Sequence, residues 1–373
     1  MTDVIADPSP AVDADMRDLA YAYGQPRTRA VVKSRPEDFH VDEELKFAPD
    51  GSGGHALLRV EKRNANTEWV ARVLARHAGV RPVDVGYAGL KDRAAVTTQW
   101  FSIDLKGKPE PDWAAPGHED IVVLEVSRHR RKLRRGVLRG NRFTLRLREV
   151  SGDRPDLEQR LACIAKTGIP NYFGEQRFGH DNLAQAAAMF ADPGRRVRHF
   201  ERGLYLSAVR AWLFNQVLTQ RVADGTWDHA LPGDAMALDG SHSFFVIDEP
   251  DADIDARLAV GDIHPSGPLW GRGELSTREE ARRLEESSLA QYEEWRRGLE
   301  SAGLEQQRRP LRVIPARVQW SWGEERDNDN QGETTDWLEL SFALPAGAYA
   351  TSLLRELVEY GAISSGSNGA YDV

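Results

Sequence analysis

Cysteine is almost absent from this chain of 373 residues, because Cys163 is the only one. A single cysteine excludes an intramolecular disulfide and any metal cluster held by several thiolates. Long apolar runs are missing too, and no stretch approaches the roughly 20 apolar residues that a membrane-spanning helix needs. The acidic, Pro- and Ala-rich start lacks the features of a signal peptide. We therefore expect a disordered leader at residues 1–18 and a cytoplasmic protein that does not enter a membrane.

Motifs for metal and phosphate binding are missing as well. The ten histidines form no HxxxH or HxH pair, and such pairs are typical of zinc sites. The glycine-rich segment 51–55 lacks the GK[ST] ending of a phosphate-binding loop, and no complete G-x-S-x-G motif is found. We therefore expect no metal site and no phosphate-binding loop.

Negative charge is missing from one long segment, although the whole chain has a net charge of −9. Residues 128–148 contain ten cations and no carboxylate: Arg128, Arg130, Arg131, Lys132, Arg134, Arg135, Arg139, Arg142, Arg146 and Arg148. Cations without counter-charges repel each other unless an outside anion neutralises them, whereas a solvated face normally mixes charges, as residues 277–286 do. The segment therefore predicts a surface that binds a polyanion. The cations that we expect to contact it are Arg131, Lys132, Arg134 and Arg135.

Hydrophobic periodicity predicts a sheet-rich first part of the chain. A helix is expected over 67–77, with Thr67 as its N-cap. Strands are expected at 83–88, 98–105 and 121–126.

Residues 141–150 alternate with period two, as in a strand that is buried on one side. Asn141, Phe143, Leu145 and Leu147 share one face, and Arg142, Thr144, Arg146 and Arg148 share the other. The first face should pack on the protein, and the second is free to meet phosphates.

The pattern then changes to helical and later returns to strands. Helices are expected at 157–166, 204–223 and 277–300, strands at 311–322 and 337–344, and a closing helix within 344–360. A helix-rich part between two sheet-rich parts predicts one domain inserted into another.

Asp92 is the most promising chemical group. It lies between Lys91 and Arg93 in the segment GLKDRAA (89–95), directly after an expected strand. Neighbouring cations favour the ionised form of a carboxylate, which a nucleophile needs. From the spacing alone, an ordinary surface ion pair explains these residues as well.

Five segments, in this order, resemble the motifs of the TruD family of tRNA pseudouridine synthases. They are KSRPEDF (33–39), GYAGLKDRAAVTTQW (86–100), RHRRKLRRGVLRGNRFTLRLREV (128–150), GIPNYFGEQRFG (168–179) and LPAGAYATSLLREL (344–357). The resemblance implies an α+β fold, in which a pseudouridine-synthase catalytic domain with a mixed, largely antiparallel sheet is interrupted by the family's inserted α/β domain. It assigns residues 19–166 and 314–373 to the catalytic domain and 167–313 to the insert.

The resemblance also implies roles for single residues. The family's nucleophilic aspartate falls on Asp92, and the basic residue that pairs with it falls on Lys33. Lys91 is expected to contact phosphate or to be a surface charge.

Substrate contacts are implied at four further positions. Phe39, Asn141 and Phe143 match family positions, and a family aromatic that is usually Phe falls on Tyr349, which adds a hydroxyl. Phe143 is expected to stack on a flipped base and Asn141 to bind the uracil edge. From the residues alone, Phe39 and Phe143 also fit a core, Asn141 a turn, and Tyr349 the anchor of the last helix.

The implied activity is the isomerisation of uridine 13 in the D arm of tRNA, by a cofactor-free enzyme that flips the base out of its stack. We expect a monomer that requires no protein partner. A non-catalytic RNA-binding protein or RNA chaperone is the main alternative, and a metal-dependent nuclease is a third. A carboxylate at Asp92 favours the enzyme, because inside a cationic site it would repel phosphate and hinder pure binding.

Overall fold

The computed structural model describes residues 16–179, 181–192, 194–326 and 334–361. Within these residues the chain divides into two compact units. Unit 1 comprises residues up to 25, 166–314 and 348–356; unit 2 comprises 26–165, 315–347 and the residues from 357 onward. The domain limits expected at 166/167 and 313/314 stay a prediction. The two units differ from the expected domains because residues 19–25 and 348–356 belong to the helix-rich unit 1.

The leader expected at 1–18 lies mostly outside the described residues. Met16–Asp18 form a short 3-10 helix, η1, and Met16 is 6% exposed. Its side chain belongs to the apolar core of unit 1. These last three positions are therefore part of the folded structure.

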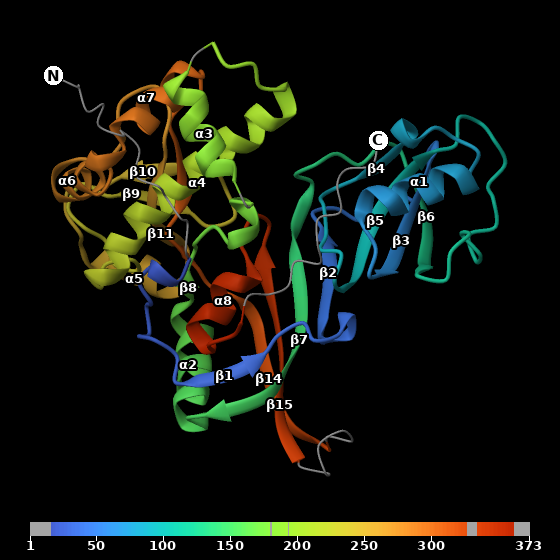
Figure 1. Cartoon of the computed structure of the whole chain (residues 1–373), viewed down its shortest axis with the longest axis horizontal. Helices are drawn as coiled ribbons and strands as arrows, with labels where there is room; N and C mark the ends of the chain where they lie inside the picture. The colour runs from blue at the N-terminus through green and yellow to red at the C-terminus, as the bar shows by residue number, and fades with distance from the viewer. Residues whose placement is uncertain (1–15, 180, 193, 327–333, 362–373) are drawn as a thin grey trace, which may run out of the picture. The chain divides into compact units, whose positions relative to one another are not determined.

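Unit 2 is built on a large sheet (Figure 1). Its strands are β1 (Thr28–Val31), β2 (Phe39–Leu45), β3 (His55–Arg63), β4 (Val85–Tyr87), β5 (Val96–Asp104), β6 (Ile121–His129), β7 (Leu138–Gly152), β14 (Ala316–Arg326) and β15 (Thr334–Pro345). The order is β14–β15–β7–β2–β5–β3–β6, with β1 paired to β7 and β4 to β5. β2 and β5 are parallel and every other described pair is antiparallel, which confirms the mixed, largely antiparallel sheet.

Strand β7 shows the predicted alternation. Phe143, Leu145 and Leu147 are buried, whereas Arg142 is exposed. The strand lies between β15 and β2 and is longer than expected. A Cβ atom at Gly140 would collide with the carbonyl of Leu344 on β15, so only glycine allows the two strands to approach this closely here.

Helix α1 (Thr67–His77) covers part of this sheet, and Leu74 packs with Leu58 and Phe101 in a core without solvent access. Its N-cap is Asn66, one residue earlier than expected. The Thr67 hydroxyl instead accepts a hydrogen bond from the backbone N–H of Lys91 at 3.0 Å. Thr67 is therefore wrong as the cap, because its side chain is committed to the loop that holds Asp92.

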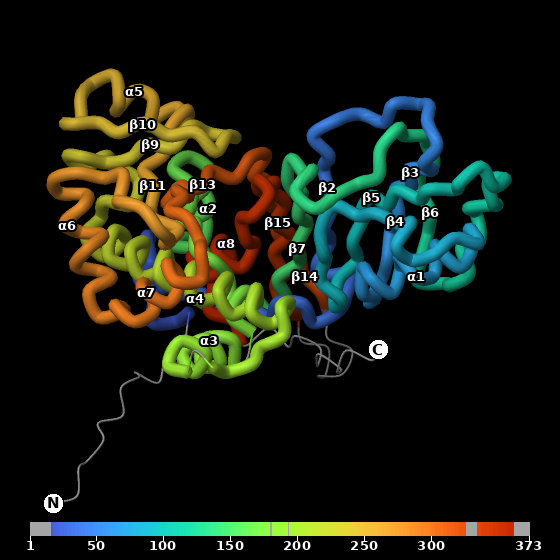
Figure 2. Tube along the Cα trace, turned by 90° about the horizontal axis from the view of Figure 1, so that it is seen from above, coloured from blue at the N-terminus to red at the C-terminus, as the bar shows by residue number. Residues whose placement is uncertain are grey.

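Unit 1 combines helices with antiparallel strands. Its four-stranded sheet has the order β10 (Phe244–Val246), β9 (Ala235–Leu238), β11 (Ile263–Leu269) and β12 (Gln307–Pro310), and β8 (Ile169–Pro170) pairs with β13 (Arg312–Val313). The helices are α3 (Asn182–Ala191), α4 (His199–Ala223), α5 (Ala252–Val260), α6 (Glu279–Ser288), α7 (Glu293–Ser301) and α8 (Ala350–Leu357). Helix α2 (Arg154–Thr167) crosses the boundary between the units. Figure 2 shows α5 beside β9 and β10, where Ile254 and Met236 share an apolar cluster.

One expected helix of this region is divided in the structure. The helix expected over 277–300 is split into α6 and α7 by a 3-10 turn, η5 (Ala290–Tyr292). Leu289 and Tyr292 turn into the core of unit 1 at this point and are 0% and 8% exposed. The closing helix, Ala350–Leu357, lies within the expected range 344–360. None of the helices in the described part of the chain combines the length and apolarity needed to cross a membrane.

Candidate active site

Asp92 lies in the loop between β4 and β5, and its carboxylate meets an ammonium group from a distant part of the chain. Lys33 Nζ donates to Asp92 Oδ2 at 2.6 Å. The Lys33 side chain is 9% exposed, whereas that of Asp92 is 43% exposed. A buried cation thus holds a carboxylate that stays open to solvent, and a charge-assisted hydrogen bond of this length orients it.

The backbone at Lys33 is strained. Its φ angle is 58°, in a region that residues other than glycine seldom adopt. Such strain persists only where surrounding structure imposes it, and it is common at functional sites. The turn η2 (Pro36–Asp38) follows directly, and its Asp38 accepts hydrogen bonds from Ser34 Oγ and from the Arg35 backbone N–H at 3.0 and 3.1 Å. Lys33 thus lies just before this turn, and Phe39 follows it as the first residue of β2.

Arg148 on β7 holds this turn in place. It pairs with Asp38, which is 2% exposed, at 2.7 Å. Burial alone would raise the pKa of Asp38, but hydrogen bonds from Arg148 and Ser34 outweigh it and keep the pKa below its ordinary 3.8. Arg148 also pairs with Glu325. The expectation that Arg148 faces phosphates is therefore corrected, because its guanidinium already binds two carboxylates.

Phe39, Phe143 and Phe342 form an aromatic cluster beside Lys33. Lys33 Nζ lies 3.9 Å from the centroid of the Phe39 ring, in a cation–π contact. Phe143 stacks on Phe342 with centroids 5.2 Å apart and meets Phe39 edge-on at 6.1 Å. Phe39 is 3% exposed and Phe143 is 7% exposed. Both rings thus serve the core, and stacking on a flipped base stays a prediction.

Lys91 does not lie where a phosphate contact requires it. Its Nζ donates to Glu43 Oε1 at 2.7 Å, and the two side chains are 7% and 0% exposed. Glu43 Oε2 accepts a further hydrogen bond from the Trp100 backbone N–H at 2.8 Å. The expectation of an exposed cation at Lys91 is corrected: its ammonium forms a buried ion pair that ties the Asp92 loop to β2.

Asn141 carries an acceptor that needs a donor. It lies on β7 opposite Glu43 on β2 and Leu344 on β15. Its Oδ1 atom is buried and has no hydrogen-bond partner among the described residues. An unsatisfied buried acceptor costs about 1–3 kcal/mol, so such an atom calls for an explanation. A donor on a bound ligand is one, in agreement with the predicted contact to the uracil edge.

Tyr349 belongs to unit 1, whereas the other predicted site residues belong to unit 2. Its ring packs against Phe173 with a centroid distance of 6.0 Å and an interplanar angle of 60°. The Arg309 guanidinium covers the same Phe173 ring at 4.1 Å, and burial lowers the pKa of Arg309 to about 10. Tyr349 is half-buried beside this aromatic and cationic cluster.

The ten cations of 128–148 do not share one environment. Four have carboxylate partners from elsewhere in the chain: Arg128 with Glu110, Arg142 with Glu44, Arg146 with Glu339, and Arg148 with Asp38. The expectation that all ten lack counter-charges, and that the outward face of β7 is free for phosphates, is therefore wrong. The others are exposed, and the described residues place no carboxylate within ion-pair distance of them: Arg130, Arg131, Lys132, Arg134, Arg135 and Arg139.

Five of these six cations lie on the connection between β6 and β7, and Arg139 lies at the start of β7. We call residues 130–139 together the basic loop. Lys132 Nζ donates to the carbonyl of Val83, so its side chain is partly committed to the fold. Arg131, Arg134 and Arg135 are exposed and, among the described residues, have no carboxylate within ion-pair distance. Within the described residues, this part of the predicted polyanion surface combines exposure with the lack of a carboxylate partner.

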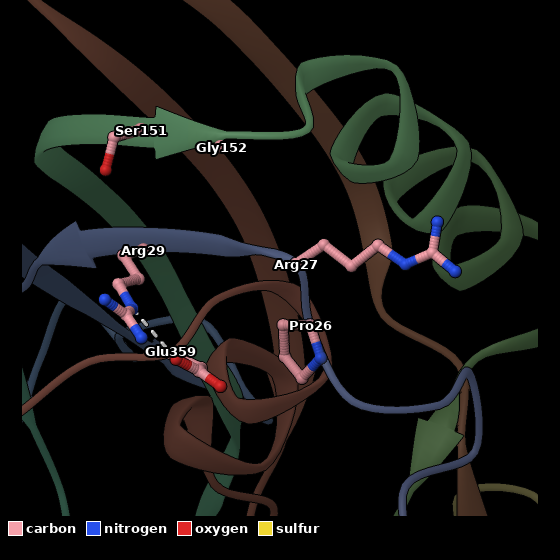
Figure 3. Close-up of a pocket in the computed structure, with 6 residues that line it drawn as sticks. All are labelled: Pro26, Arg27, Arg29, Ser151, Gly152 and Glu359. Carbon is pink, nitrogen blue, oxygen red and sulfur yellow. Dashed lines mark hydrogen bonds and ion pairs between the residues drawn. The ribbon is translucent and has the colours of Figure 1, made fainter.

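A separate hollow of unit 2 lies near the start of β1 (Figure 3). It is lined by Pro26, Arg27, Arg29, Ser151, Gly152 and Glu359. Arg29 pairs with Glu359 across it at 3.1 Å, and both side chains are more than half exposed. None of the predicted site residues lines this hollow, and exposed ion pairs of this kind contribute little to stability. No group of His, Cys, Asp and Glu suited to a metal ion occurs in the described part of the chain.

Comparison with known proteins decides the family. The model of the family tRNA pseudouridine synthase D (TruD) matches residues 16–187 and 181–357. The chain belongs to the TruD family. It is 52% identical to tRNA pseudouridine synthase D of Nitrosococcus oceani, over 93% of this chain and 96% of that protein. The corresponding protein of Methylococcus capsulatus is 50% identical, over 92% and 95% of the two chains.

A solved TruD structure has the same fold. The crystal structure of the Methanosarcina mazei protein aligns with a TM-score of 0.66 and covers 91% of this chain and 95% of its own. Its sequence is 20% identical, so the likeness concerns the fold alone. The implied α+β TruD fold is confirmed.

Several residues that support the TruD site were missed in the sequence. Asp38 and Glu43 stand in or just after the P-E-D-F motif, yet nothing in their spacing reveals that they bind Arg148 and Lys91. Lys62 was missed altogether, although its Nζ donates to the Asp92 carbonyl at 2.9 Å. The available signal was a lysine within the apolar alternation of β3, where a buried charge is unusual.

Lys33→Met is expected to lower turnover by at least about 100-fold, since the Asp92 carboxylate loses the cation that orients it. Binding of tRNA should change much less, because Lys33 is almost buried. The measurement is the single-turnover rate beside the Kd for tRNA. Lys46→Met, which removes a surface lysine from the same unit, is the control. Equal rates for both variants would show that the Lys33–Asp92 pair serves stability only.

Proposed function

We propose that this chain converts uridine 13 in the D arm of tRNA to pseudouridine, with Asp92 as the nucleophile. The observation that carries the proposal is the 2.6 Å hydrogen bond between Lys33 and Asp92, formed by two separate motifs in a chain 52% identical to a tRNA pseudouridine synthase D. An RNA-binding protein without activity would not need a half-exposed carboxylate oriented by a buried ammonium group. The site therefore favours an isomerase.

The reaction is an isomerisation that conserves every atom. The N1–C1′ bond of the uridine breaks, the uracil rotates, and C5 bonds to C1′, while the hydrogen on C5 is lost and N1 gains one. Asp92 supplies an ionised carboxylate at the reacting nucleotide. Lys33 holds that carboxylate in one orientation and balances its charge.

The target base must leave its stack, which costs a few kcal/mol. The Asn141 Oδ1 atom offers an unused acceptor that suits the N3–H group of uracil. Phe39 and Phe143 are nearly buried, so we assign them to an apolar wall beneath the base. Tyr349, a half-buried residue of unit 1, stays a predicted contact to the tRNA. The basic loop supplies phosphate contacts through Arg131, Arg134 and Arg135, and Lys132 contributes charge.

The proposed catalytic groups also bear on whether a second protein chain is needed. Both proposed catalytic groups, Lys33 and Asp92, come from one chain. We therefore propose that the chain acts as a monomer. We also propose that it meets tRNA in the cytoplasm and uses no cofactor.

The decisive experiment incubates metal-free protein with an unmodified tRNA transcript that carries uridine 13, with excess EDTA added after the tRNA has folded. Pseudouridine is then mapped by position. We expect it at position 13 at the same rate with and without EDTA, and none in a transcript with cytidine at 13. Modification elsewhere would overturn the positional assignment. A rate that recovers only when a divalent ion is restored would overturn the cofactor-free mechanism.

A further inference from the structure

Lys62 is a buried ammonium group beside the nucleophile, and the mechanism above gives it no role. It is the penultimate residue of β3, and its side chain has no solvent access. Its Nζ donates to the Ala65 carbonyl at 2.6 Å and to the Asp92 carbonyl at 2.9 Å. Lysine is almost never fully buried unless it is paired. In the described structure, both hydrogen-bond acceptors of this ammonium group are backbone carbonyls, and neither is a carboxylate.

The position of Lys62 is electrostatically costly and coupled to the site. Burial lowers the pKa of its amine from 10.5 to about 8, while the charge of Asp92 raises it and that of Lys91 lowers it. An apolar residue would fit the core of β3 without this desolvation, as Val60 and Leu58 do on the same strand. The ammonium group therefore calls for a reason other than packing.

The loop that carries Asp92 is held by hydrogen bonds to its backbone at several positions. Gln99 Nε2 donates to the Gly89 carbonyl at 3.3 Å, and Thr67 Oγ1 accepts from the Lys91 N–H at 3.0 Å. Thr67 and Gln99 also bond to each other at 2.9 Å. The hydrogen bond from Lys62 differs from these two, because it is made to the backbone carbonyl of Asp92 itself. Lys33 then fixes the carboxylate end of the same residue.

We propose that Lys62 is a positioning residue for the nucleophile: its ammonium group fixes the main chain of Asp92 so that the carboxylate faces Lys33 and the target nucleotide. The inference rests on the proposed role of Asp92. Fixing both ends of one side chain matters, because a displacement of about 1 Å at a reacting group lowers a rate by about 100-fold.

The test is Lys62→Met, which keeps an unbranched apolar side chain, lacks the ammonium group and removes both hydrogen bonds. The single-turnover rate is expected to fall by about 100-fold, while the Kd for tRNA changes by less than about threefold. Lys62→Gln keeps an N–H donor on a side chain one atom shorter than that of lysine, and its rate should fall between those of Lys62→Met and the wild type. It also serves if Lys62→Met does not fold.

Val60→Ala is the matched control, because Val60 is equally buried two residues earlier on the same strand. It should lower Tm and leave the rate per folded molecule unchanged. Amide hydrogen exchange of residues 89–95 is followed in parallel. We expect it to speed up in Lys62→Met and to stay slow in Val60→Ala.

Two outcomes would overturn the proposal. One is a Lys62→Met protein whose rate per folded molecule equals that of Val60→Ala; the other is unchanged exchange of residues 89–95. If the wild type forms no pseudouridine, the proposed function fails instead. The exchange measurement still decides whether Lys62 holds the Asp92 loop.

Discussion

Asp92→Asn is expected to reduce pseudouridine formation by at least about 10⁴-fold, while the Kd for tRNA stays within tenfold, a limit of about 1.4 kcal/mol. Asparagine has nearly the same shape and still accepts a hydrogen bond from Lys33, so the turn and the loop should stay in place. It lacks the negative charge that nucleophilic attack or charge stabilisation requires. The measurement is single-turnover formation of pseudouridine together with tRNA binding.

Asp42→Asn is the matched control for this change. Asp42 is 39% exposed, close to the 43% of Asp92, and it also pairs with a cation, Arg59, at 2.9 Å. It lies on β2 and has no proposed role in the reaction. Asp42→Asn should therefore keep full turnover. An Asp92→Asn protein as active as this control would remove Asp92 from the mechanism.

Replacing Arg131, Lys132, Arg134 and Arg135 together by Gln is expected to weaken tRNA binding by at least about 100-fold at 50 mM salt. Each phosphate contact contributes about 0.7–0.9 to the slope of log K against log[salt], because neutralisation releases counterions. Loss of the three arginine contacts should therefore flatten the slope by about 2 to 2.7, and loss of the Lys132 charge adds to this. The measurement is the Kd for tRNA across a salt series.

Two double variants on neighbouring segments sharpen this test. Arg134→Gln with Arg135→Gln removes two exposed cations without carboxylate partners, whereas Arg142→Gln with Arg146→Gln removes two that pair with Glu44 and Glu339. Both pairs change the net charge equally, yet only the first should flatten the slope. Equal slopes for the two double variants would show that binding depends on total charge, and would move the phosphate path away from the basic loop.

Much of the fold follows from local patterns. The alternation at 141–150 predicts a strand buried on one face, and β7 has Phe143 and Leu145 inside. The helix over 67–77 is also present with the expected bounds. Where the prediction fails, a residue turns inward for tertiary reasons: Leu289 and Tyr292 enter the core of unit 1 and split the helix expected over 277–300.

The site was predicted less evenly. Lys33 and Asp92 are 59 residues apart in sequence, and only the resemblance to the family links them before the structure shows their contact. The roles of Phe39 and Phe143 at the base stay predictions, since the two rings are nearly buried. Lys91, which carries a charge next to Asp92, proved to be a buried partner of Glu43.

The sequence by itself determined which residue types stand together along the chain: a carboxylate between two cations in the loop after β4, and a cation-rich segment that ends in an alternating strand. Tertiary structure decided which charges stay free. Arg148 is neutralised by Asp38 because β7 pairs with β2, and Arg146 by Glu339 because β7 also pairs with β15. Lys62 reaches the Asp92 backbone for the same kind of reason. The electrostatic state of a side chain depends on the charged and polar groups within a few ångströms of it. The fold brings such groups together from positions 30 to 193 residues apart in the sequence. Local spacing along the chain does not encode these contacts.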